Sequence, residues 1–142
     1  MCNRLSFEEL LLIAEAVLEM PYEELEQMVC IFRAESSLAA PFARVCGVAL
    51  HPDPVEQAAI CAMRLIRSRP FPVGNRAIGY ECMREMLVRS GYRWSRPMED
   101  AEEISETLKR LDTGEVSEEE FVSWVRSRAK LSEHLRGDAR RA

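Results

Sequence analysis

The sequence has little of what metal sites, disulfide frameworks and membrane spans are built from. It contains two histidines, and its five cysteines include no Cys-x-x-Cys pair. That odd number and that spacing argue against a disulfide framework and against a zinc site. The longest apolar run, residues 10–14, is far too short to cross a bilayer, and the N-terminus lacks the charge order of a signal peptide. We therefore expect a protein of the reducing cytoplasm with no membrane partner.

An excess of positive charge is also missing. The net charge is −5 and the sequence pI is about 5.2. No overall positive field would attract a phosphate backbone, so nucleic acid is not an expected partner. Apolar residues make up 47% and charged residues 30% of 142 positions. This is the balance of one globular domain that can bury its own core.

No stretch shows sustained alternation of apolar and polar residues, so no long strand is expected. Helical periodicity predicts an all-α, compact single-domain bundle of about six or seven helices. Capping signals begin at Ser6, Asp53 and Ser117. The predicted helical stretches are residues 7–18, 21–32, 36–45 (interrupted by Pro41), 54–67, 75–90, 97–111 and 118–125. Cys30, Cys61 and Cys82 lie in apolar helical contexts and are expected to be buried.

The chain is organised around one loop, residues 68–76, which contains two prolines and a glycine. Apolar helical patterns precede and follow it. Its last residues, Gly74, Asn75 and Arg76, lead directly into a helix. Such a loop presents free backbone N–H groups and the positive end of a helix dipole, an arrangement that suits an anion such as phosphate.

The loop and its flanks resemble the Fic/Doc (Fido) family, and in particular its short death-on-curing toxin branch. The family loop reads His-Pro-Phe-x-Asp-Gly-Asn-Lys-Arg-Thr, and the matching positions here are residues 69–78, Arg-Pro-Phe-Pro-Val-Gly-Asn-Arg-Ala-Ile. Residues 50–59 resemble the family's approach to the preceding helix, and residues 87–92 its Leu-x-x-Asn-Gly-Tyr segment. The resemblance covers residues 5–129. It implies a Fic/Doc-like domain over residues 1–130. From about Leu131 the chain loses apolar periodicity, so residues 131–142 are expected to form a flexible C-terminal tail.

The residues that differ from the family are those that carry its chemistry. The resemblance implies a histidine base at position 69, but Arg69 stays protonated and cannot accept a proton. It implies an acidic magnesium ligand at position 73, but Val73 offers no oxygen. It implies a phosphate-binding arginine at position 77, where the chain has Ala77. We therefore expect no catalytic residue and no metal ligand in the loop.

Other parts of the loop are retained. Phe71 is expected to anchor it in the core, and Gly74, Asn75 and Arg76, together with Arg69, could hold an anion or a nucleotide such as ATP without a well-held magnesium. The alternative is that Arg69 and Arg76 are solvated or internally paired on an inactive loop. Of the histidines, His51 is expected in a surface loop in the wrong part of the fold for a base, and His134 in the tail.

Three functions remain open at this level. The first is a pseudoenzyme of toxin–antitoxin type that acts by binding a protein partner, either an antitoxin-like protein or a target. The second is a toxin that still transfers phosphate or AMP from a nucleotide to a Ser or Thr hydroxyl on a protein. The third is a purely structural module, for which substitutions in the loop would leave partner binding unchanged.

Overall fold

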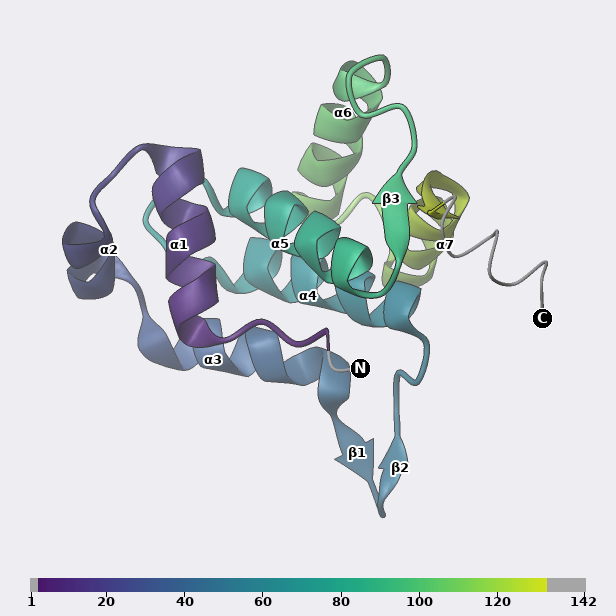
Figure 1. The fold of residues 1–142 in the computed structure, drawn as a ribbon, viewed down its shortest axis with the longest axis horizontal. Coiled ribbons are helices and arrows are strands. Elements are labelled where there is room, and N and C mark those ends of the chain that lie inside the picture. Colours follow the sequence, from purple (N-terminus) through teal and green to yellow (C-terminus); the bar gives the residue numbers. More distant parts are fainter. Residues whose placement is uncertain (1–2, 133–142) are drawn as a thin grey trace.

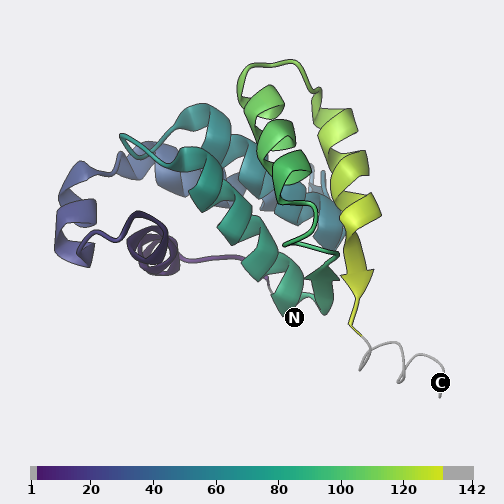
Figure 2. The same cartoon turned by 90° about the horizontal axis from the view of Figure 1, so that it is seen from above.

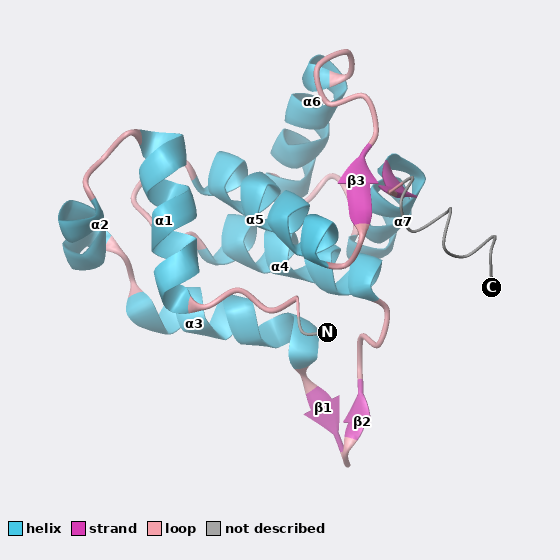
Figure 3. Cartoon of the chain, in the orientation of Figure 1, coloured by secondary structure: helices cyan, strands magenta, loops and turns pink. Residues whose placement is uncertain are grey.

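The computed structural model describes residues 3–132, most of which are helical (Figure 1, Figure 3). The fold is all-α, as the periodicity predicts, with two small antiparallel two-stranded sheets. The helices of the described part are α1 (Phe7–Leu18), α2 (Tyr22–Met28), α3 (Ile31–Ala39), the 3-10 helix η1 (Ala40–Phe42), α4 (Pro54–Ser68), α5 (Asn75–Arg89), α6 (Ala101–Asp112) and α7 (Glu118–Arg128). The strands are β1 (Arg44–Val45), β2 (Val48–Ala49), β3 (Tyr92–Trp94) and β4 (Ala129–Leu131).

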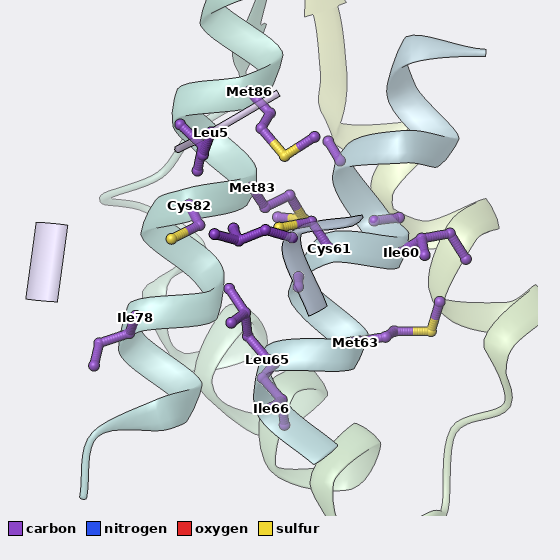
Figure 4. Close-up of a cluster of buried hydrophobic side chains, with 14 of the residues drawn as sticks. Leu5, Ile60, Cys61, Met63, Leu65, Ile66, Ile78, Cys82, Met83 and Met86 are labelled. Carbon is purple, nitrogen blue, oxygen red and sulfur yellow. The ribbon is translucent and has the colours of Figure 1, made fainter. Parts of the chain in front are cut away.

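A hairpin of two helices, α4 and α5, forms the centre of the molecule, and the organising loop joins them (Figure 1). Small residues let the two backbones approach closely. A Cβ added at Gly79 of α5 would stand 3.0 Å from Cγ1 of Ile66 and 3.2 Å from the carbonyl oxygen of Ala62, both on α4. Figure 4 shows a cluster of buried hydrophobic side chains, most of them from these two helices. The labelled ones are buried, and they include Cys61, Leu65, Ile66, Cys82, Met83 and Met86.

The remaining helices pack on both sides of this hairpin. Figure 2 shows α1 and α2 on one side and the neighbouring helices α6 and α7 on the other. Charged side chains tie the ends of the helices together. Arg128 of α7 pairs with Asp100 and Glu103 at the start of α6, and Arg126 pairs with Asp53, which caps α4. The loop between α4 and α5 is thus held in a frame supported from both sides.

The N-terminus of α1 is fastened to the end of α5 by a single carboxylate. Ser6 and Glu9 form the predicted capping box, and Glu9 also pairs with Arg89. The Arg89 guanidinium, together with the backbone N–H of Ser6, lowers the pKa of Glu9 from 4.5 to about 2. Because the folded state holds Glu9 ionised more firmly than the unfolded chain does, this contact stabilises the fold above pH 4.5. The contribution is lost as the pH falls from 4.5 towards 2.

Replacing Glu9 with glutamine should therefore have a pH-dependent effect. The Glu9 side chain is 37% exposed, so solvent screens the ion pair, and we expect a loss of about 0.5–1 kcal/mol at pH 7. Urea unfolding of both proteins should show this difference shrinking below pH 4.5. Glu8→Gln, in the same first turn, is the matched control and should show no such convergence. A difference that stays constant down to pH 2.5 would contradict this account of Glu9.

The predicted helix over residues 21–32 is wrong in its length. Pro21 is the N-cap rather than the first helical residue, and the chain is extended at Val29 and Cys30 between α2 and α3. The backbone N–H of Cys30 donates to the carbonyl oxygen of Pro70 at 2.8 Å, so the central loop takes the hydrogen bond that a continuous helix would need. The break turns Phe32 outward, where it is 80% exposed, and leaves Cys30 exposed, contrary to the prediction. Cys61 and Cys82 are buried as predicted.

Two other boundaries differ from the predicted ones. Of residues 36–45 only the first part is helical, and the chain then forms the hairpin β1–β2 around Cys46 and Gly47, which both have positive φ. The helix predicted from residue 97 begins at Ala101. At the C-terminus, β4 pairs with β3 through Leu131, so the predicted domain boundary at residue 130 falls inside a strand. The rest of the predicted tail, from residue 133 and including His134, lies outside the described residues.

Candidate functional site

The loop between α4 and α5 is anchored by the side chain for which the sequence predicts this role. Phe71 is 2% exposed and belongs to the main core. Asn75, the first residue of α5, fixes the backbone around it. The Asn75 side chain accepts a hydrogen bond from the Phe71 N–H at 3.1 Å and donates one to the Phe71 carbonyl oxygen at 2.7 Å. The Asn75 side chain thus stabilises the conformation of the loop. Asn75 is also one of the residues predicted to form the anion site.

Two further contacts hold the loop against α2 and α3. The hydroxyl oxygens of Ser37 and Ser68 lie 2.9 Å apart, which joins α3 to the last residue of α4. The hydrogen bond from Cys30 to Pro70 joins the α2–α3 junction to the loop itself. Neither contact was predicted, because each partner is distant in sequence and carries no local signal. Together they fasten Ser68 and Pro70 to α3 and to the α2–α3 junction, while residues 72–74 of the loop are exposed.

The start of α5 keeps the geometry of an anion-binding turn. Gly74 is the N-cap in the left-handed conformation, with φ of 79°, and no side chain caps the first amides of the helix. Unpaired first-turn amides and the positive end of the dipole favour a negative charge at this point. Arg76 stands in the same turn and opposes the dipole unless an anion lies beside it.

Such an anion is present in the chain itself. The carboxylate of Asp112, the last residue of α6, lies between the two arginines of the loop. Its Oδ1 accepts a hydrogen bond from Nη2 of Arg69 at 2.7 Å, and its Oδ2 lies 3.8 Å from Nε of Arg76. This is internal pairing, one of the two alternatives that the sequence leaves open for these arginines. The sequence analysis did not identify Asp112. The only feature of the sequence that could have indicated Asp112 is its position at the C-terminal end of a predicted helix, where the helix dipole disfavours an acidic residue.

The positions that differ from the Fic/Doc pattern are turned to solvent. Val73 is 59% exposed, and Ala77 lies exposed on the first turn of α5. Within residues 3–132, no group of three or more His, Cys, Asp or Glu side chains is placed to hold a metal ion. The carboxylate that contacts this loop, Asp112, is engaged by both arginines. The residues present therefore do not fit the magnesium ion that the resemblance implies.

A cleft of about 360 Å³ lies beside the loop, between α5 and α6. Arg76 and Arg84 line it together with an apolar wall that includes Ala77, Ile104 and Leu108. Tyr80 also lines it, with its ring 5.7 Å from the Arg84 guanidinium and its hydroxyl oxygen buried without a hydrogen-bond partner. Burial raises the pKa of Tyr80 above its ordinary value. The cleft thus offers the guanidinium groups of Arg76 and Arg84 beside an apolar wall, while the Tyr80 hydroxyl is buried behind it.

The other titratable groups considered from the sequence are engaged elsewhere. His51 hydrogen-bonds through Nδ1 to Oε1 of Glu56 at 2.7 Å, near the start of α4. The loop follows the other end of this 15-residue helix, about 22 Å away along its axis. Glu81 and Glu85 pair with Arg84 and Arg89 on α5. These side chains are paired away from the arginines of the loop, and His51 cannot serve there as a base.

Comparison with protein-family models, with curated proteins and with solved structures gave no match. The Fic/Doc relationship therefore stays a prediction from the residues of the loop and its flanks. Among residues 3–132, no helix is long and apolar enough to cross a membrane.

Proposed function

We propose that this chain is a Doc-like pseudoenzyme of toxin–antitoxin type that acts in the cytoplasm by binding a protein partner. The observation that carries the proposal is the contrast within one loop. Its frame is complete, with Phe71 buried and Asn75 bonded to the Phe71 backbone. Its working positions are altered, because Arg69 cannot act as a base, Val73 cannot bind a metal ion, and Ala77 cannot clamp a phosphate.

The charge arrangement supports binding over catalysis. General-base catalysis needs a group that loses a proton near neutral pH, and a guanidinium does not. Arg69 instead forms an ion pair with Asp112, which is the behaviour of a structural or ligand-holding group. An ordered, positively charged loop without a proton acceptor can hold a ligand but cannot activate a hydroxyl. The partner would be an antitoxin-like protein or a former target of the active family members.

A labelling experiment tests this proposal. The full chain is incubated with γ- or α-labelled ATP, magnesium and a bacterial lysate. We expect no labelled protein from the wild type. Labelling that appears with the wild type and disappears with Arg76→Ala would support the competing function, transfer of phosphate or AMP to a protein hydroxyl, and would overturn the pseudoenzyme proposal.

Restoring the missing groups is the complementary test. The triple variant Arg69→His, Val73→Asp, Ala77→Arg returns the base, the metal ligand and the clamp to a loop whose frame is intact. We expect it to gain labelling activity or toxicity on expression. The matched control is the double variant Val73→Asp, Ala77→Arg, which lacks only the base and should stay inactive. An inactive, folded triple variant would show that the frame is not that of a transfer loop.

A further inference from the structure

We propose that the cleft between α3 and the segment that precedes α1 binds a second copy of this chain, so that two copies form a two-fold symmetric dimer through their α3 helices. The cleft has a volume of about 510 Å³. One wall is formed by residues 4–7 and the other by the outer face of α3, which run beside each other (Figure 1). No residue of the loop between α4 and α5 lines this cleft, so the proposal does not rest on the proposed function.

Helix α3 presents a second face to this cleft, distinct from the one that it buries in the core. Four residues that line the cleft have the spacing i, i+3, i+4 and i+7, which places them on one side of the helix: Phe32, Glu35, Ser36 and Ala39. Phe32 is 80% exposed, and Ile31 beside it is 52% exposed. Apolar side chains exposed together at the edge of a cleft indicate an interaction surface.

The shape of this face is complementary to itself. Phe32 lies at its N-terminal end, and the small residues Ser36 and Ala39 follow one and two helical turns later. A two-fold axis across the middle of the face sets the two α3 helices antiparallel, because it pairs the N-terminal end of each helix with the C-terminal end of the other. Each Phe32 ring then stands over Ser36 and Ala39 of the other copy, where the small side chains leave room for it.

The charges of the cleft are also complementary to themselves. Arg4 and Glu35 are the charged residues that line it, one on each wall. Within residues 3–132 neither side chain has an ion-pair partner, and the Arg4 guanidinium lies 5.8 Å from the centre of the Phe42 ring. A two-fold arrangement brings Arg4 of each copy towards Glu35 of the other, so that two ion pairs form. A second copy thus supplies the ring, the base and the acid that this cleft accepts.

Sedimentation velocity of the full chain over a range of concentrations tests the proposal. We expect the wild type to dimerise reversibly. Phe32→Ala should weaken the dimer by at least about tenfold, because it removes an aromatic ring from both halves of the contact. Met98→Ala is the matched control, since Met98 is 85% exposed but lines the cleft between α5 and α6, and it should leave the dimer unchanged. Circular dichroism checks that both variants are folded.

Exchanging the charges identifies the occupant of the cleft. Arg4→Glu or Glu35→Arg alone brings like charges together across the two-fold axis, and each should abolish dimerisation. The double variant restores opposite charges and should dimerise. A mixture of the two single variants should form a mixed dimer, because both pairs are again of opposite charge. Only a contact between Arg4 of one copy and Glu35 of another predicts that result.

Three outcomes would overturn the proposal. The first is a wild-type chain that stays monomeric at the highest concentration at which it is soluble. The second is a dimer that Phe32→Ala leaves intact, because the contact would then lie elsewhere on the surface. The third is a monomeric wild type that binds a different protein and loses it on Phe32→Ala, which would assign the cleft to that protein.

Discussion

Replacing Phe71 with alanine is expected to destabilise the protein by about 3–5 kcal/mol, the usual cost of emptying a buried aromatic site. Phe71 is 2% exposed and belongs to the main hydrophobic core. Refilling its space is difficult, because the neighbouring backbone is fixed by the two hydrogen bonds to Asn75 and by the bond from Cys30 to Pro70. The measurement is the free energy of unfolding from urea titration followed by circular dichroism.

Two variants calibrate the effect of Phe71→Ala. Val73→Ala, at the other large apolar side chain of the loop, removes a group that is 59% exposed and should change stability by less than about 0.5 kcal/mol. Phe71→Leu keeps most of the buried volume and should cost less than half as much as the alanine variant. A loss below about 1 kcal/mol for Phe71→Ala would mean that the loop is not anchored in the core.

Much of the frame could be predicted because its causes are local. The capping boxes at Ser6 and Ser117, and the Asp53-Pro54 start of α4, occur where the sequence places them. The side chains predicted to face inward on α5 are buried. Gly91, which is predicted to end this helix, follows it with a positive φ. Each depends on residues within about one helical turn, so a short window of sequence contains the information.

The features that could not be predicted depend on partners far along the chain. Asp112 meets Arg69 over 43 positions, and its only local sign is a carboxylate on the wrong end of a helix. The break between α2 and α3 arises because Cys30 donates to Pro70 of the central loop. The same break exposes Phe32, which helical periodicity places inside. In both cases a long-range hydrogen bond overrides a local preference.

In the proposed pseudoenzyme, binding and catalysis are separated within this one loop. What fixes its shape is apolar burial and backbone hydrogen bonding, supplied by Phe71 and Asn75. The family's reactive groups would stand at positions 69, 73 and 77, and the side chains at these positions face solvent. Substitutions at these exposed positions cost little stability, so a chain can lose the chemistry while the frame persists. A loop kept in this way remains available for a ligand or a partner.

The glycine at the end of the loop provides the second large expected effect. Gly74→Ala should destabilise the protein by about 2–5 kcal/mol, from two separate causes. The residue has φ of 79°, which costs an alanine about 1–2 kcal/mol. An added Cβ would also stand 2.4 Å from Cδ2 of Leu18, so the Leu18 side chain must shift, and such overpacking costs about 1–3 kcal/mol.

Two variants separate these causes. Gly114→Ala has nearly the same φ, 82°, but nothing lies within 4 Å of its added Cβ, so it should show the backbone cost alone. Combining Gly74→Ala with Leu18→Ala removes the colliding atom, and in a double-mutant cycle we expect a favourable coupling of about 1–2 kcal/mol. If Gly74→Ala costs no more than Gly114→Ala and shows no coupling to Leu18, the end of α1 does not press on the loop. With the coupling present, the Leu18 side chain at the end of α1 packs against the N-terminal turn of α5 and helps to hold it in place.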